Sequence, residues 1–461
     1  MRNNNHIVIM AGGVGSRFWP MSTPEYPKQF VDVLGRGMSM IQMTVERFAP
    51  LCPIENMWVV TSADYEALVR EQLPQLPVEN ILLEPAMRNT APCIAYACWK
   101  IRQKNPSANV VVTPADALVV DVDDFRKVIG RALAFTAAGH RIVTVGIRPT
   151  RPETGYGYIE IAGQAGNDGV AHDGADNEGA GSVNDGVGND GGGSVNDGVA
   201  HDGVDNDGGG SGNDGVANDG ADNDGGGSCN DGVAHDGADN DGGGSGNDGV
   251  GNDGGGSVND GVGNDGADND DADVTPDLIG SPLKVDSFRE KPALEVARQY
   301  LAAGNYLWNA GIFVWNIDTI VESLRAFVPG LAAKMDIMSE SFFTPSEREI
   351  VGNVFPTCEK ISIDYAVMEK ADYIYTIPGD FGWSDVGTWG SLWTLLQHDE
   401  NDNAVVGDNV HLNDCSGCIV HAPGSKSVVL QGLEDSIVVE RDGRLLICKL
   451  SEEQRIKDFK K

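Results

Sequence analysis

Strand-like and helix-like runs alternate from residue 6 to residue 161, and this alternation restricts the fold more than any other feature of the chain. Candidate strands lie at Ile7–Met10, Met57–Thr61, Val110–Thr113 and Arg141–Gly146, and candidate helices near Met40–Phe48, Ala63–Gln72, Ala91–Lys104 and Asp123–Ala138. This pattern is typical of an α/β domain with a mainly parallel sheet. Ligands bind such sheets beyond the carboxyl ends of the strands. We therefore expect the chemistry in the loops that follow the strands.

A glycine-rich run follows the first candidate strand directly. It contains Gly12, Gly13, Gly15 and Arg17, and it is followed by the run Pro27-Lys28-Gln29-Phe30. Glycine lets the backbone approach an anion closely, and the two cations supply charge where a triphosphate would lie. The spacing is not that of a P-loop, and Trp19-Pro20 stops a helix from starting at once, as a dinucleotide fingerprint would require. The run indicates a phosphate cradle, with an ordinary βα turn as the alternative for the glycines alone.

The charge of the chain is unevenly distributed. The net charge is −36, and residues 165–274 hold 26 of the 69 acidic residues with no Lys or Arg. The other 351 residues carry 43 acidic and 33 basic residues, and this is enough chain to bury a large core. The chain shows no basic stripe for nucleic acid and no apolar run that could span a membrane.

The N-terminus shows no signal-peptide pattern, and the eight cysteines are scattered along the chain. The pair Cys415 and Cys418 lacks the second pair that a zinc site needs, so we interpret it as structural. We therefore expect a cytoplasmic protein whose thiols are mostly reduced.

The segment 165–274 consists of near-identical units rich in Asn, Asp and Gly. Units of 17 residues begin at Asn167, Asn196, Asn213 and Asn230, and units of 12 at Asn184 and Asn247. Large apolar residues are almost absent, so the segment cannot bury a core. Calcium-binding β-rolls need a nine-residue period with a large apolar residue in each turn, and neither is present. We expect a low-complexity, disordered loop, with a calcium-folded roll as the alternative.

The repeats separate two alternating, strand-like runs, 155–160 and 284–292. We therefore interpret the repeats as an expanded hairpin loop. The fold could survive this insertion, because loop length costs only about 0.6 kcal/mol of free energy per doubling. After a helix near Ala293–Ala303 and further helices to about Ile350, short β runs with turns begin at about residue 403. The sequence thus predicts a catalytic domain over 1–164 and 275–400, an insertion over 165–274, and a small β-helix-like domain over 401–461.

Several polar runs besides the glycine loop carry groups fit for nucleotidyl transfer, which needs a divalent metal as well as a phosphate cradle. Asp116 follows a candidate strand, and Asp385 lies in Gly382-Trp383-Ser384-Asp385-Val386-Gly387. One or two carboxylates are what Mg²⁺ takes from a protein, although each aspartate also fits a turn. Glu84 and Asn89 are candidates for reading a base edge and Arg88 for meeting phosphate, whereas Asn89 or Thr90 also fits a helix cap.

Together these runs resemble the mannose-1-phosphate guanylyltransferase family of sugar nucleotidyltransferases. The runs that carry the resemblance keep the family's order, and they are Gly12–Phe30, Glu84–Pro92, Pro114–Asp116, Arg148–Tyr158, Phe288–Pro292, Trp308–Phe313, Ser362–Lys370 and Trp383–Trp389. The resemblance covers about 6–164 and 275–400. It implies a Rossmann-like nucleotidyltransferase domain with a mainly parallel mixed sheet. It also implies that GMP passes from GTP to α-D-mannose 1-phosphate, giving GDP-mannose and pyrophosphate.

The resemblance assigns roles residue by residue. The catalytic residues would be Arg17, facing pyrophosphate, and Lys28, beside the α-phosphate or the sugar phosphate. The nucleotide would be bound by Gly12, Gly13, Gly15, Glu84, Arg88, Asn89 and Thr90. The sugar would be bound by Gly155, Glu290, Lys291, Asn309 and Gly311. Asp116 and Asp385 would hold Mg²⁺ or another divalent cation. GTP and mannose 1-phosphate would be the partners, and a homodimer is the candidate assembly.

The chain departs from the family pattern at three places. Ala117 stands where the family commonly has a His after the metal aspartate. The chain ends about 75 residues after Asp385, so we do not expect the C-terminal isomerase domain of the long bacterial members. The repeats have no counterpart in the family.

Three other functions remain open on the sequence. They are transfer to another hexose 1-phosphate or from another nucleotide, a non-catalytic sensor that binds GDP-mannose, and a calcium-binding or interaction protein built on the repeats.

Overall fold

The computed structural model describes residues 4–13, 15–162, 280–425 and 427–459. The repeat segment, and with it the expectation of a disordered loop, lies outside the described residues. The sequence-predicted elements of the first half are present at nearly the predicted positions. They are the strands β1 (Asn5–Ala11), β2 (Met57–Ser62), β4 (Asn109–Pro114) and β6 (Ile142–Ile147), and the helices α1 (Met40–Phe48), α2 (Glu66–Gln72), α3 (Thr90–Lys104) and α4 (Val122–Ala137).

A nine-stranded mixed sheet forms the centre, in the order β3-β2-β1-β4-β9-β6-β10-β8-β7. The remaining strands are β3 (Ile81–Glu84), β7 (Tyr158–Ile161), β8 (Leu283–Arg289), β9 (Tyr306–Asn316) and β10 (Ile374–Gly379). Because β9 pairs antiparallel with β4, β6 and β7, and β8 pairs antiparallel with β10 and β7, these two strands run against the other seven. The mainly parallel mixed sheet expected from the sequence is confirmed.

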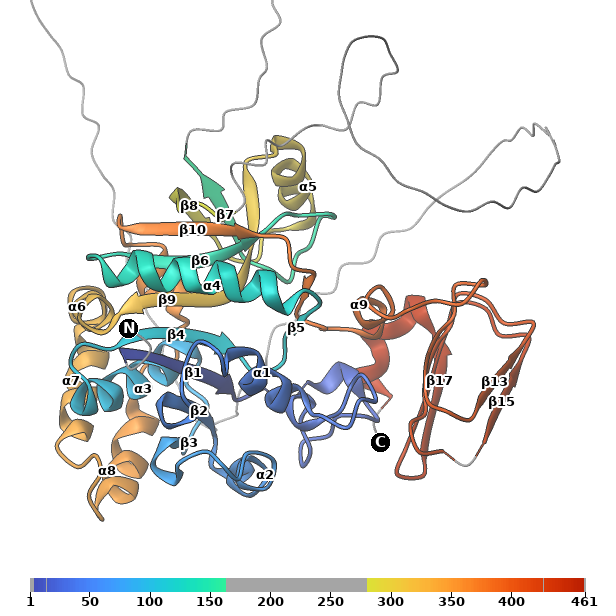
Figure 1. Cartoon of the computed structure of the whole chain (residues 1–461), viewed down its shortest axis with the longest axis horizontal. Coiled ribbons are helices and arrows are strands. Elements are labelled where there is room, and N and C mark those ends of the chain that lie inside the picture. Colours follow the sequence, from blue (N-terminus) through green and yellow to red (C-terminus); the bar gives the residue numbers. More distant parts are fainter. Residues whose placement is uncertain (1–3, 14, 163–279, 426, 460–461) are drawn as a thin grey trace, which may run out of the picture. The chain divides into compact units, whose positions relative to one another are not determined.

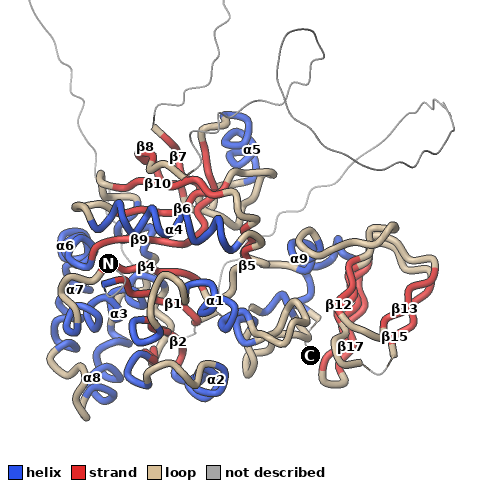
Figure 2. Tube along the Cα trace, viewed as in Figure 1, coloured by secondary structure: helices blue, strands red, loops and turns tan. Residues whose placement is uncertain are grey.

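Helices cover both faces of this sheet (Figures 1 and 2). The apolar strand residues alternate between the two faces: Val8 and Val112 join the core beneath α3, whereas Ile9 and Val111 join the core beneath α1 and α4. The first core is completed by α6 (Ile317–Phe327), α7 (Pro329–Ser339) and α8 (Glu347–Val354). Burial on both faces explains why the strands are rich in valine and isoleucine throughout.

The strands that flank the repeat segment pair with each other. In β7 and β8 the antiparallel partners include Tyr158 with Arg289 and Ile159 with Phe288. Helix α5 (Leu294–Ala303) follows β8. The expectation that 155–160 and 284–292 form one interrupted hairpin is therefore confirmed for its described strands.

The C-terminal strands are short and mostly parallel, as a β-helix requires. They are β12 (Ala404–Val406), β13 (Val410–Asn413), β14 (Ile419–His421), β15 (Val428–Gln431), β16 (Ser436–Arg441) and β17 (Arg444–Lys449). Strands β12, β14 and β16 pair in parallel, as do β13 and β15, and β17 closes the first sheet antiparallel. These coils contact the first part of the chain, where Arg441 Nη1 donates a hydrogen bond to the Met21 carbonyl over 3.0 Å.

Candidate functional site

The glycine loop is shaped by residues from the Pro-Lys-Gln-Phe run. The Nε2 of Gln29 donates hydrogen bonds to the carbonyls of Ala11, over 2.8 Å, and Gly13, over 2.9 Å. Gly15 adopts a left-handed conformation with φ 65°, which glycine tolerates best, and its carbonyl accepts a hydrogen bond from the Ser22 hydroxyl. The loop therefore keeps a fixed shape at the carboxyl end of β1.

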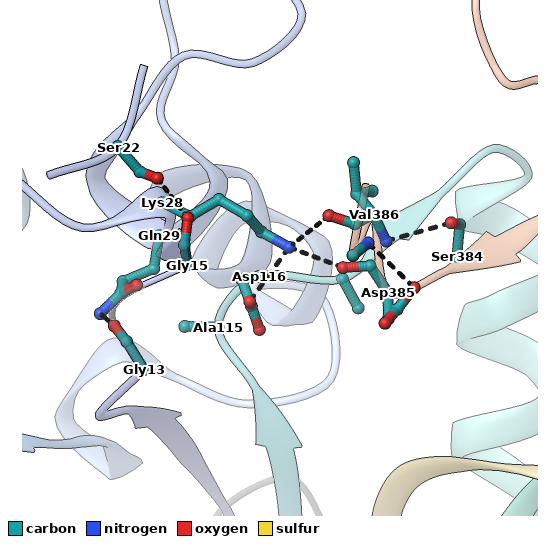
Figure 3. Close-up of polar contacts among 12 residues, drawn as sticks. Gly13, Gly15, Ser22, Lys28, Gln29, Ala115, Asp116, Ser384, Asp385 and Val386 are labelled. Atoms are coloured by element: carbon teal, nitrogen blue, oxygen red, sulfur yellow. Dashed lines mark hydrogen bonds and ion pairs between the residues drawn. The ribbon is translucent and has the colours of Figure 1, made fainter. Parts of the chain in front are cut away.

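Lys28 lies buried at the centre of the site, with 3% of its surface exposed. Its Nζ is 3.1 Å from Asp116 Oδ2 and donates to the carbonyls of Asp385 over 2.6 Å and Val386 over 2.9 Å (Figure 3). All three ammonium protons thus have partners in the protein. The main chain of Gly15 packs closely against Lys28, because a Cβ added to Gly15 would lie only 2.5 Å from Lys28 Cβ.

A two-stranded ladder brings the two predicted metal ligands to the same lysine, although they lie far apart in sequence. Asp116 follows β4, and Asp385 follows β11 (Trp383–Ser384). Strand β11 pairs antiparallel with β5 (Leu118–Val119), so the loops that carry both aspartates meet. The Oδ1 of Asp385 accepts hydrogen bonds from the Tyr156 hydroxyl over 2.6 Å and from the main-chain N–H of Gly387 over 3.1 Å.

The turn after Asp385 is strained. Val386 has φ 47°, which a β-branched residue rarely adopts. Such strain persists only where surrounding contacts enforce it, and it concentrates at functional sites. Here the Lys28 ammonium binds the two carbonyls of this turn, and Val386 is fully buried.

The carboxylates beside Lys28 form a small set of oxygen donors. Across the described ranges, no group of three or more His, Cys, Asp or Glu side chains could hold a metal ion. The side chain of Asp116 is 39% exposed, and its ion pair with Lys28 uses Oδ2. The carboxylate of Asp385 accepts its hydrogen bonds from described residues through Oδ1. Two carboxylates with oxygen to spare fit Mg²⁺, which takes one or two of them and completes its shell with water and phosphate.

The predicted nucleotide residues of the Glu84 run divide into two groups. Glu84, at the end of β3, is buried, and its Oε2 lies 3.5 Å from the position of a Cβ at Gly12, which links it to the glycine loop. Burial raises the pKa of its carboxyl to about 7.

The other three residues of this run, Arg88, Asn89 and Thr90, form hydrogen bonds with the main chain. Arg88 donates to the Pro356 carbonyl. The Oδ1 of Asn89 caps α3 by accepting from the Thr90 N–H over 2.8 Å, and Thr90 Oγ1 accepts from the Ile363 N–H over 2.8 Å. The capping alternative raised from the sequence is correct for Asn89.

Two of the predicted sugar residues, Glu290 and Gly311, lie near a third, Asn309 on β9. Its Oδ1 accepts from the Thr144 hydroxyl over 2.8 Å and from the Gly311 N–H over 3.1 Å. Gly157, rather than the predicted Gly155, lies against this group, because a Cβ at Gly157 would be 2.9 Å from Glu290 Oε2 and 3.5 Å from Asn309 Cβ.

The other two predicted sugar residues, Gly155 and Lys291, each contact a neighbouring glutamate. The Gly155 N–H binds Glu153 Oε1 over 3.0 Å, whereas Lys291 Nζ donates to Glu290 Oε1 over 2.6 Å. Arg17, in the 3₁₀ turn Ser16–Phe18, is exposed and has no hydrogen-bond or ion-pair partner within the part of the chain that the structure describes.

Two residues of this site were not singled out from the sequence. Gln29 stands inside the Pro-Lys-Gln-Phe run and Tyr156 inside the Gly-Tyr-Gly-Tyr run, but neither run indicates what its side chain binds. Tyr156 packs edge-on against Trp308 and Trp383, with ring centroids 5.2 and 5.4 Å away. Burial, the Asp385 charge and its hydrogen bond raise the pKa of the Tyr156 hydroxyl, so it stays a hydrogen-bond donor.

Comparison with known proteins identifies the family of the chain. The model of the nucleotidyl transferase family matches residues 6–171 and 274–402. A mannose-1-phosphate guanylyltransferase of Salmonella montevideo is 30% identical over 453 residues, which cover 98% of this chain and 72% of that protein. An enzyme of the same name from Escherichia coli K12 is 29% identical over 455 residues, covering 98% and 71%.

A solved structure shares the fold. The crystal structure of a Thermus thermophilus protein named mannose-1-phosphate geranyltransferase superimposes with a TM-score of 0.66 at 24% identity, and the match covers 99% of this chain and 98% of that one. None of the described helices has the length and apolar character needed to cross a membrane.

Proposed function

The chain belongs to the nucleotidyl transferase family, in the branch of the mannose-1-phosphate guanylyltransferases, and we propose that it transfers GMP from GTP to α-D-mannose 1-phosphate. A phosphate oxygen of the sugar attacks the α-phosphorus of GTP in line. The bond from the α-phosphorus to the bridging oxygen breaks, and pyrophosphate leaves. Because the substrate supplies the nucleophile, the protein needs no nucleophilic side chain.

The observation that carries this proposal is the junction at Lys28. One buried ammonium touches Asp116 and the Asp385 turn, and its Cβ lies against the glycine loop. Two anions must meet during the reaction, so it demands fixed geometry and an offset of their charge. Lys28 fixes the loops that carry Asp116 and Asp385, and the divalent cation that these two carboxylates would hold would supply the positive charge. The junction joins three segments, 12–15, 116 and 385, that the sequence separately predicts to bind phosphate or metal.

The remaining residues take the roles that their positions support. The loop Gly12–Gly15 binds the nucleotide phosphates, and the exposed guanidinium of Arg17 meets the leaving pyrophosphate. An ionised Glu84 accepts hydrogen bonds from the donors on the guanine edge, which adenine does not present in the same pattern. Glu290 and Asn309 bind hydroxyls of the sugar, with Lys291 and Gly311 beside them.

Asp116 and Asp385 would hold the divalent cation. The bound cation would offset the charge of the phosphates and favour attack at the α-phosphorus. Tyr156 and the Gly387 N–H orient Asp385 through its Oδ1, and Lys28 holds the same turn by its carbonyls. Ala117 leaves no imidazole next to Asp116, so this chain performs the reaction without one.

A substrate panel tests the proposal. Purified protein with MgCl₂ is given GTP or ATP with mannose 1-phosphate or glucose 1-phosphate, and pyrophosphate release is followed. We expect GTP with mannose 1-phosphate to give the highest kcat/KM. Asp385→Asn should abolish most turnover, whereas Asp380→Asn, at an exposed acid five residues earlier, should not. Background rates for all four pairs with folded protein would refute the proposal.

A further inference from the structure

Asp364 is an acidic side chain that lies next to the group around Asn309. Its Oδ1 accepts a hydrogen bond from Asn309 Nδ2 over 3.4 Å. No Lys, Arg or His of the described ranges forms an ion pair with it. Burial, and then the charge of Glu290, raise the pKa of this carboxyl to about 7. A buried carboxylate without an ion-pair partner is stabilised by a ligand whose hydroxyl groups donate hydrogen bonds to it.

The orientation of the Asn309 amide is fixed by its other contacts. Two donors, the Thr144 hydroxyl and the Gly311 N–H, bind its Oδ1, so its NH₂ group must face away from them. That NH₂ group faces Asp364. A hydrogen-bond donor and an acceptor therefore stand side by side at this position.

The backbone around Asp364 is unusual and firmly anchored. Residues Asp364–Met368 form a π-helical turn, a rare conformation that is frequent at functional sites. Just before it, the Ile363 N–H binds Thr90 Oγ1 over 2.8 Å, and the Ala91 N–H binds the Ile361 carbonyl over 3.1 Å. The turn that presents Asp364 is thus fastened to the first residues of α3.

We propose that Asp364 and Asn309 bind two neighbouring hydroxyls of the hexose, an inference that rests on the proposed sugar phosphate substrate. One hydroxyl donates to the Asp364 carboxylate, and its neighbour accepts from the Asn309 NH₂ group. A vicinal diol matches this pair, because each hydroxyl can both donate and accept. Asp364 is then a substrate-binding residue of the sugar side and has no part in binding GTP.

Kinetics of Asp364→Asn test the assignment. The substitution keeps the shape of the side chain and replaces its carboxylate by an amide that also carries donors. We expect KM for mannose 1-phosphate to rise by about tenfold or more, as loss of a hydrogen bond to a charged group predicts, with KM for GTP unchanged. Asp372→Asn, at an exposed acid nearby, is the matched control and should leave both constants unchanged.

Deoxy sugars separate direct contact from a structural effect. Wild type and Asp364→Asn are compared with mannose 1-phosphate and its 2-, 3-, 4- and 6-deoxy analogues. With one analogue the ratio of the wild-type kcat/KM to that of Asp364→Asn should fall to about one. The hydroxyl that Asp364 binds is missing from that analogue, so the substitution has no contact left to remove. Asp364→Ala should give the same pattern without placing a second amide against Asn309.

The results distinguish failure of the assignment from failure of the proposed function. An unchanged ratio across all four analogues, or an equal rise of KM for GTP, would overturn the assignment of Asp364. If wild type itself shows no turnover with mannose 1-phosphate, the proposed function fails, and the assignment that rests on it fails with it. If wild type turns over and Asp364→Asn matches it in KM for the sugar phosphate, only the inference about Asp364 fails.

Discussion

Replacing Gly15 with alanine tests whether the glycine loop and Lys28 act as one unit. An alanine Cβ would lie 2.5 Å from Lys28 Cβ. Carbon atoms in favourable contact are about 3.5–4.0 Å apart, so one of the two must move by about 1 Å or more. Lys28 is held by its three Nζ contacts, and the loop by Gln29. Either way, the substitution displaces a group that the proposed reaction requires.

The expected magnitude follows from that displacement. A shift of about 1 Å at reacting groups can cost about 100-fold in rate. The left-handed φ of 65° adds about 1–2 kcal/mol of strain for alanine, which is small enough for the protein to stay folded. We therefore expect Gly15→Ala to lower kcat/KM by about 100-fold, with only a modest fall in Tm.

Steady-state pyrophosphate release and calorimetry measure the two effects. Gly130→Ala is the matched control, because Gly130 lies within α4 and an added Cβ there meets nothing within 4 Å. It should raise stability slightly, as alanine favours helix, and leave kcat/KM unchanged. Turnover of Gly15→Ala within error of wild type, in folded protein, would refute the view that the loop positions Lys28.

Three further predictions concern other parts of the chain. The pKa of Glu84 is about 7 in the folded protein, against an ordinary value of 4.5. Between pH 4.5 and 7 only the folded state keeps this proton, so the free energy of unfolding should fall as the pH rises through this window. Asp364, whose pKa is also raised to about 7, adds the same trend. Glu84→Gln should therefore flatten a plot of Tm against pH, and an unchanged slope would contradict the burial argument. Tyr156→Phe removes the 2.6 Å hydrogen bond to Asp385 and should lower kcat about tenfold or more while Tm stays near that of wild type; wild-type kcat would show that Asp385 needs no such support. Deleting 166–273 should leave kcat/KM unchanged, because β7 and β8 can pair across a short turn, and a severe loss of turnover would place the repeats in the site.

Local patterns were enough to predict the elements whose signals are local. Helix α1 begins and ends at the predicted residues, and the buried strands β1 and β4 lie within one or two residues of their predicted bounds. Each is a continuous apolar run or an amphipathic repeat, and each is read without knowing its neighbours. Strands β3, β10 and β11 were not predicted, because runs of two to six residues leave helix, strand and loop equally open.

Long-range contacts account for what the sequence did not reveal. Lys28 and Asp385 are 357 residues apart, and the pairing of β5 with β11 places the Asp385 turn beside the Asp116 loop, where Lys28 contacts both. The reversed direction of β9, which places Asn309 beside Gly157, depends on sheet order, and no local pattern encodes that order. Residue types could suggest phosphate, metal and sugar groups, but the position of Gly157 beside Glu290 and Asn309 could be found only from the fold.

The most direct test of the central proposal is to identify the products. Protein, Mg²⁺, GTP and mannose 1-phosphate are incubated and followed by ³¹P NMR, and the reverse reaction is run from GDP-mannose and pyrophosphate. We predict equal amounts of GDP-mannose and pyrophosphate in the forward direction, and GTP with mannose 1-phosphate in the reverse. Unchanged substrate signals in both directions, or phosphate release without a sugar nucleotide, would contradict the proposed GMP transfer.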